Sequence, residues 1–185
     1  MPAFARFTIV LGSPGAGKDT QLELLERACG AQILYIGQTI RRAAETNKNI
    51  EQYLESGALV PQSIITTLYE LKLQEFGPTD WLISDGFPRS VEQADWLEQL
   101  LNQSFTSISE VILLDIPQSE ALDRLKKRAR HDDTNNTVVQ RFETFERETG
   151  PVIERYKSAG LLKVVDGVGS IEQVFDRFKI ALGVS

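Results

Sequence analysis

Cysteine is almost absent from this chain of 185 residues, in which Cys29 is the only thiol. A single cysteine cannot form an internal disulfide, so the chain has no cross-linked framework of its own. The first residues, MPAFARF, also lack the long apolar stretch and the small-residue cleavage site of a signal peptide. We therefore expect a cytoplasmic protein.

Long apolar runs and an excess of positive charge are missing as well. No run approaches the ~20 residues of a membrane span, so no membrane association is expected. Lysine and arginine total 20 against 26 aspartates and glutamates, a net charge of −6, so nucleic acid is not an expected partner. Any polyanion bound here must meet a local cluster of cations. With 42% hydrophobic residues, the composition is that of one globular domain, which we place at residues 1–185.

Five short apolar runs alternate with longer segments of helical periodicity. The runs predict β-strands at Phe7–Gly12, Gln32–Ile36, Trp81–Ser84, Val111–Ile116 and Leu161–Val165. The other segments predict helices at Lys18–Cys29, Val91–Leu101, Ser119–Arg130, Asn136–Ala159 and Ser170–Leu182. Because parallel strands need crossover connections, this alternation predicts an α/β fold: a five-stranded parallel sheet with helices on both faces. Ligands are expected at the carboxyl ends of the strands.

Two stretches interrupt this alternation. Over forty residues, Gly37 to Pro78, lie between the second and third strands and carry several helical segments broken at Gly57 and Pro61. This length exceeds one crossover, so we predict a small substrate-binding insertion within it. The polar stretch ARHDDTNN, at 129–136, predicts a mobile connection between two helices.

The segment from Gly12 to Lys18 reads GSPGAGK, which fits the phosphate-loop pattern G-x-x-x-x-G-K. It stands directly after a predicted strand and before a predicted helix, as the mechanism of that loop requires. Glycines let successive backbone N–H groups surround phosphate oxygens, and the helix N-terminus adds partial positive charge. Lys18 can reach the outer phosphates, so the loop predicts binding of a nucleoside triphosphate.

One position departs from this pattern, which places a serine or threonine after the lysine to bind Mg²⁺. Here Asp19 follows Lys18, and Thr20 comes next. Either Thr20 takes over that contact, or phosphates and water hold the ion. Asp19 itself is open to two interpretations, a residue that stabilises the helix N-terminus or a Mg²⁺ contact.

A second motif, DGFPR at Asp85–Arg89 with Gln93 shortly after it, follows the third strand. Together with the phosphate loop, this resembles the nucleoside monophosphate kinases, and the adenylate kinase family in particular. The resemblance extends over nearly the whole chain. It includes the motifs GALVP at 57–61, RLKKR at 124–128, RHDD at 130–133, Arg141 in QRFETF, and VGS at 168–170.

The resemblance implies reversible phosphoryl transfer from MgATP to AMP, giving two ADP, by a monomer. It implies an AMP-binding insertion at about 36–66 and a short lid at about 128–136. AMP would be bound by Ile36, Arg41, Ala58, Leu59, Val60, Gly86, Arg89, Gln93, Arg130 and Arg141. ATP would be bound by Gly12, Pro14, Gly15, Ala16, Gly17, Lys18, Asp19, Thr20, Arg124 and Gly169.

The same resemblance implies catalytic roles for Lys18, Arg89, Arg128, Arg130 and Arg141. Asp85, acting through water, and Thr20 would position Mg²⁺. Cations suit this chemistry because phosphoryl transfer spreads negative charge over the transferred group and needs little covalent work from the protein.

Two departures from the family keep other functions in view. Ile36-Gly37-Gln38 stands where adenylate kinases usually have Thr-Gly-Asp, and only Ala129 separates Arg128 from Arg130. UMP/CMP kinase activity is therefore one alternative. A nucleotide-sensing module that has lost most of its turnover is the other.

Overall fold

The computed structural model describes residues 4–77, 79–128 and 135–184. Its centre is one sheet in which the strands lie in the order β2-β3-β1-β4-β5 and every neighbouring pair is parallel. The strands are β1 (Phe4–Leu11), β2 (Gln32–Tyr35), β3 (Thr79–Asp85), β4 (Ile108–Asp115) and β5 (Leu162–Asp166). The predicted five-stranded parallel α/β fold is confirmed.

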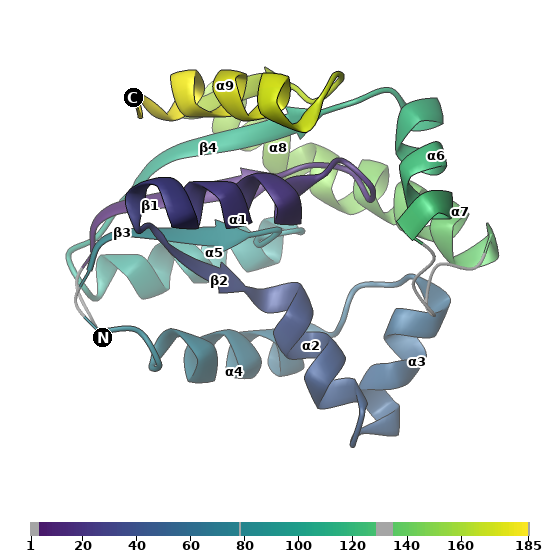
Figure 1. Ribbon diagram of the computed structural model, residues 1–185. Helices are drawn as coiled ribbons and strands as arrows, with labels where there is room; N and C mark the ends of the chain where they lie inside the picture. The colour runs from purple at the N-terminus through teal and green to yellow at the C-terminus, as the bar shows by residue number, and fades with distance from the viewer. Residues whose placement is uncertain (1–3, 78, 129–134, 185) are drawn as a thin grey trace.

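Helices cover both faces of the sheet, and Figure 1 shows α1 and α5 on opposite sides of it. The helices are α1 (Lys18–Cys29), α2 (Ile36–Ala44), α3 (Lys48–Ser56), α4 (Gln62–Leu73), α5 (Val91–Asn102), α6 (Gln118–Arg128), α7 (Asn135–Thr144), α8 (Gly150–Ser158) and α9 (Ile171–Leu182). Within the described ranges, none of them is both long and apolar enough to cross a membrane.

The alternation of side chains along the strands divides the core into two clusters. Phe7, Ile9 and Leu11 of β1 point into the first cluster, whereas Val10 points into the second. Successive residues of a strand face opposite sides of the sheet, so a fully buried parallel strand must be apolar on both. The first cluster is packed by α4, α5 and α8, and the second by α1, α6 and α9.

The segment between β2 and β3 forms α2, α3 and α4, as the several helical segments predicted there require. The predicted breaks at Gly57 and Pro61 are found where α3 ends and α4 begins. Gly57 has φ +72°, a left-handed conformation in which a side chain is strained, and an added Cβ would lie 2.9 Å from the Thr137 carbonyl oxygen of α7.

Some boundaries differ from the prediction. β2 ends at Tyr35, and α2 already begins at Ile36. The single helix predicted at Asn136–Ala159 is instead α7, a π-helical turn at Phe145–Thr149, and α8. Residues 129–134 of the predicted mobile connection lie outside the described residues.

A buried glutamate joins four strands at the amino-terminal part of the sheet. Glu110 of β4 is 7% exposed and accepts hydrogen bonds from Arg6 and Thr8 of β1 and from Lys163 of β5. Thr8 in turn accepts one from the Trp81 indole of β3 at 2.8 Å. Burial by itself raises the pKa of Glu110, but the hydrogen bonds from Lys163, Thr8 and Arg6 outweigh it and hold that pKa below 4.5.

We expect Glu110→Gln to lower the free energy of unfolding at pH 7 by about 1–3 kcal/mol, because the amide loses the charge-assisted hydrogen bonds. A carboxylate with a lowered pKa stabilises the fold above its unfolded-state pKa and stops doing so as pH falls through its folded-state pKa. The difference between wild type and variant is therefore full above pH 4.5 and shrinks in more acidic solution. Urea denaturation from pH 3 to 7 measures it.

Glu154→Gln is the matched control, since Glu154 pairs with Lys157 on the surface, where both side chains are more than 60% exposed. This control changes stability by less than about 0.5 kcal/mol. A Glu110→Gln protein as stable as wild type at neutral pH would contradict the assigned role of the buried carboxylate.

Candidate active site

The segment between β1 and α1 forms a compact loop at the carboxyl edge of the sheet. Gly15 and Gly17 have φ of +82° and +94°, conformations that L side chains rarely adopt. Added Cβ atoms at Gly12 and Gly15 would lie 2.7 and 2.6 Å from the carbonyl oxygens of Leu114 and Ala121. The loop is therefore glycine-rich for steric reasons, and it ends at the N-terminus of α1, where backbone N–H groups attract anions.

This loop forms one wall of a cavity of about 530 Å³, a size that suits small-molecule ligands. Most of the predicted site residues line it: Gly12, Pro14, Gly15, Ala16, Gly17, Lys18, Asp19, Thr20, Ile36, Arg41, Ala58, Leu59, Val60, Asp85, Gly86, Arg89, Gln93, Arg124 and Arg141. They come from segments spread over more than 120 residues of sequence. The fold thus gathers both predicted binding sites into one continuous space.

Three predicted residues are not among them. Gly169 does not line the cavity and lies in the loop between β5 and α9. Arg130 falls outside the described residues, and so does the side chain of Arg128 at the end of α6.

Asp85, the last residue of β3, lies beside the glycine-rich loop because β3 pairs with β1 in a register that sets Asp85 opposite Val10. Its side chain is buried, and its Oδ1 accepts no hydrogen bond from the described residues. Burial raises the pKa of Asp85 to about 6, an effect that nearby Lys18 opposes and Asp19 reinforces. A carboxylate so placed is suited to meet a cation or its hydrating water.

Arg89 lies at the far end of the DGFPR turn and is held from several sides. Its Nε donates to the Gly86 carbonyl at 2.6 Å, and its backbone N–H donates to Gln93 Oε1 at 2.8 Å. Its own carbonyl accepts a hydrogen bond from the Thr149 hydroxyl at 3.1 Å. Burial lowers the pKa of Arg89; Asp85 opposes this shift, and Arg141 adds to it. The guanidinium nevertheless keeps its proton, as arginine does in proteins.

Arg124 of α6 bridges two loops at the other end of the cavity. Its Nη1 donates to the Ala16 carbonyl of the glycine-rich loop at 3.3 Å, and its Nη2 donates to the Gly167 carbonyl after β5 at 2.9 Å. Its Nε pairs with Glu120 one helical turn earlier. The guanidinium plane is thereby fixed between the glycine-rich loop and the loop that leads to α9.

Residues of α3 and α7, two helices that Figure 1 shows next to each other, also line the cavity. The Thr137 hydroxyl of α7 donates to the Glu55 carbonyl of α3 at 2.8 Å, and Arg141 Nη2 donates to the Leu54 carbonyl at 3.5 Å. Because Arg141 also lines the cavity, α7 presents this cation to the site while its helix rests on α3.

Several cavity residues were not predicted, among them Tyr53, Lys127, Thr144, Phe145 and Thr149. The spacing from Arg141 contains a signal for two of them, since Phe145 and Thr149 follow it at four and eight residues and so fall on one helical face. No signal in the sequence marks Tyr53, which is one of several aromatic residues on helices.

Known proteins resemble this chain over most of its length. The family model described as adenylate kinase matches residues 10–161. An adenylate kinase of Mycobacterium leprae is 36% identical over 179 residues, which cover 95% of this chain and 98% of that protein. One of Thermus thermophilus is 36% identical over 184 residues, covering 95% and 96%. The glycine-rich loop, the buried aspartate beside it and the convergent arginines described above are therefore features of a family member. The chain belongs to the adenylate kinase family.

Proposed function

We propose that this protein catalyses reversible phosphoryl transfer from MgATP to AMP, giving two ADP. The observation that carries the proposal is the single cavity that joins the glycine-rich loop to Arg41, Arg89, Gln93 and Arg141. One end provides backbone N–H groups and Lys18 for a triphosphate. The other provides guanidinium groups for a monophosphate, so two nucleotides can meet phosphate to phosphate.

The donor nucleotide is assigned to the glycine-rich loop. The N-terminus of α1 and Lys18 would hold its outer phosphates, while the backbone N–H groups between Gly12 and Gly17, other than at Pro14, would surround them. Arg124, fixed over this loop, would border the adenine and the phosphates. Gly169 is kept as an ATP-binding residue because it lies in the same loop as Gly167, whose carbonyl Arg124 contacts.

The acceptor is assigned to the insertion at 36–66 and the DGFPR turn. Arg41 and Arg89 would bind the monophosphate, Gly86 would flank it, and Arg141 would lie between the two nucleotides. Ile36 and the backbone of Ala58–Val60 would contact the base. Arg128 and Arg130, whose side chains fall outside the described residues, would bind the transferred phosphoryl group from the short lid at 128–136, as the family resemblance implies.

The residues present fit a Mg²⁺ ion that arrives with the nucleotide. The described part of the chain contains no group of three His, Cys, Asp or Glu residues that could hold a metal by itself. Asp85 offers an unpartnered buried oxygen beside the glycine-rich loop, and Thr20 a hydroxyl at the start of α1. Mg²⁺ keeps several waters and binds through phosphates plus one or two carboxylates. When bound, the ion would neutralise phosphate charge; Asp85 would order its water.

Catalysis is then positioning and charge compensation. The cations named above neutralise the equatorial oxygens of the phosphoryl group during transfer, and no general base is required of the protein.

The two alternatives, UMP/CMP kinase activity and a sensing module, receive no support from the relatives, which are named adenylate kinase. We also propose that the protein acts in the cytoplasm as a monomer.

Gln93 gives the proposal a specific base preference. A backbone N–H can only donate, so the hydrogen bond from Arg89 fixes Oε1 of the nearly buried Gln93 and directs Nε2 to the base. An NH₂ donor pairs with an acceptor such as N1 of adenine. It does not pair with the N1–H of hypoxanthine or the N3–H of uracil.

A coupled assay of ADP formation with AMP, CMP, UMP and GMP tests the function. We expect ATP consumption that depends on AMP, with two ADP formed per ATP, and a fall in kcat of at least about a hundredfold in Lys18→Met. Nucleotide binding without turnover would favour the sensing module. A preference for UMP or CMP would favour the alternative acceptor.

We expect kcat/KM for AMP to exceed that for IMP by more than about tenfold, and Gln93→Glu to reverse the preference. A glutamate still accepts from the Arg89 N–H, but it turns a second acceptor towards the base, which repels adenine N1 and pairs with the N1–H of hypoxanthine. Gln103→Glu, at the exposed end of α5, is the matched control and leaves the ratio unchanged. An unaltered AMP/IMP ratio in Gln93→Glu would remove Gln93 from base recognition.

We expect Asp85→Asn to make the protein more stable and less active. Burial raises the pKa of Asp85 from 3.8 to about 6, so the free energy of unfolding of the wild type falls as pH rises through that range. An asparagine does not ionise, so the variant keeps this stability. In EDTA at pH 7 the variant gains up to about 3 kcal/mol, and the gain disappears below pH 4. Asp80→Asn, exposed on the same strand, is the control and shows no such gain. Equal stability of Asp85→Asn and wild type across pH 4–7 would contradict the burial argument.

A further inference from the structure

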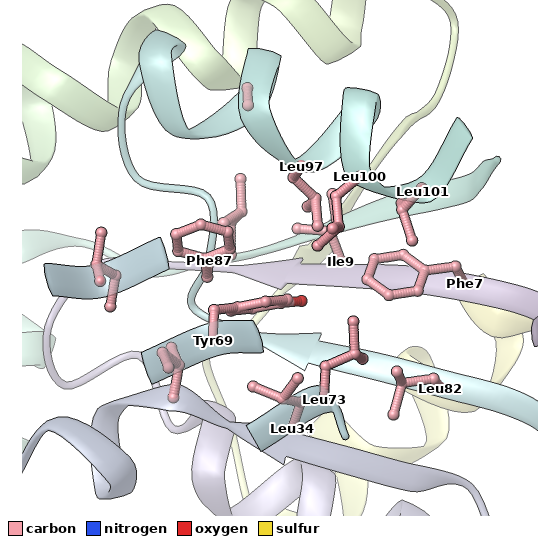
Figure 2. Close-up of a cluster of buried hydrophobic side chains, with 14 of the residues drawn as sticks. Phe7, Ile9, Leu34, Tyr69, Leu73, Leu82, Phe87, Leu97, Leu100 and Leu101 are labelled. Atoms are coloured by element: carbon pink, nitrogen blue, oxygen red, sulfur yellow. The ribbon is translucent and has the colours of Figure 1, made fainter. Parts of the chain in front are cut away.

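Tyr69 of α4 is a completely buried polar residue that the chemistry above does not use. Figure 2 shows its ring beneath that of Phe87, and the two ring centroids are 4.4 Å apart. Trp96 of α5 packs edge-on against both rings. A phenylalanine at position 69 would fill this space equally well, so packing accounts for the ring but not for the hydroxyl.

The hydroxyl of Tyr69 begins a chain of two hydrogen bonds. It donates to Ser84 Oγ at 2.9 Å, and Ser84 Oγ donates to the Phe87 carbonyl at 2.9 Å. The direction is fixed, because a carbonyl can only accept, so the serine proton must point to Phe87 while its lone pair receives the tyrosine proton. Burial raises the pKa of Tyr69, which keeps that proton in place at physiological pH.

The Phe87 carbonyl belongs to the turn from Gly86 to Arg89, which is held at each end by another element. Gly86 N–H donates to the Val10 carbonyl of β1 at 2.8 Å. Arg89 is held by Gln93 of α5 and by Thr149 of the π-helical turn. Between these ends, the hydrogen bond from Ser84 fixes the middle of the turn.

The orientation of this turn determines where the Arg89 guanidinium lies. Arg89 Nε donates to the Gly86 carbonyl, which is one peptide before the Phe87 carbonyl that Ser84 holds. A rotation of the Phe87 peptide would therefore shift the neighbouring Gly86 carbonyl and the guanidinium attached to it. A displacement of about 1 Å at a substrate-positioning group is enough to change turnover substantially.

We propose that Tyr69 is a positioning residue that acts through Ser84 and the Phe87 carbonyl to place Arg89 for the acceptor phosphate. This inference rests on the proposed function, because it assumes that Arg89 binds the phosphate of the monophosphate. It assigns to α4, a helix of the core, an effect on the acceptor side of the reaction only.

The test compares Tyr69→Phe, Ser84→Ala and the double variant with wild type. We expect kcat/KM for AMP to fall three- to tenfold in each single variant, while KM for ATP changes less than twofold. In the double variant, kcat/KM for AMP is no lower than in the more impaired single variant, because both substitutions remove the same relay to the Phe87 carbonyl. Hydrogen exchange of the Arg89 amide is faster in all three.

Tyr156→Phe is the matched control. Tyr156 is also buried in the first cluster, and its hydroxyl forms no hydrogen bond to Ser84 or to the turn among the described residues. This control leaves both KM values and the Arg89 amide unchanged, even if its stability falls. Loss of stability in Tyr69→Phe without an acceptor-side effect would show that Tyr69 is structural and would overturn the inference.

The two proposals fail in different ways. A wild-type protein without AMP-dependent turnover contradicts the proposed function, whereas the hydrogen-exchange measurement still tests the relay. An active wild type whose Tyr69→Phe variant keeps both its AMP kinetics and its Arg89 exchange rate contradicts the relay alone.

Discussion

The pairing of β1 with β3 is the constraint on which the site depends. Its parallel register sets Val10 opposite Asp85, so both strands end at the same edge and the two loops that follow them lie side by side. Neither loop could form the cavity alone, since one carries backbone donors and the other carries a carboxylate and Arg89. The apolar residues packed on both faces of these strands therefore also fix the distance between the glycine-rich loop and the DGFPR turn.

Buried charge at this edge is tolerated because opposite charges meet there. Asp85 loses hydration on burial, and Lys18, Arg89 and Arg41 recover only part of that loss, so its pKa remains raised. Arg89 experiences the reverse, with a burial penalty that Asp85 offsets in part. Such imperfect compensation is typical of sites prepared for a charged ligand, because the missing interactions are completed only when the ligand arrives.

The sequence predicted the fold and the site best at segments whose residue types are compatible with few structures. Runs such as Val111–Ile116 predicted the strands, and the glycines of 12–17 predicted the loop, because few other structures suit those residues. The π-helical turn at Phe145–Thr149 was not predictable, since its residues have ordinary helical propensity and tertiary packing selects the wider turn. The carbonyl contacts of Arg124 were equally hidden, because they depend on how close two distant loops approach.

That wider turn has a geometric consequence for the long helical stretch that contains it. Val138 and Val152 are 14 residues apart, a spacing that an uninterrupted α-helix would place within about 40° of one another around its axis. One residue absorbed by the π-turn changes this angle to about 140°. Val138 accordingly packs in the second cluster and Val152 in the first. The extra residue in the π-turn thus shifts the helical phase, so that α7 and α8 contribute side chains to clusters on opposite faces of the sheet.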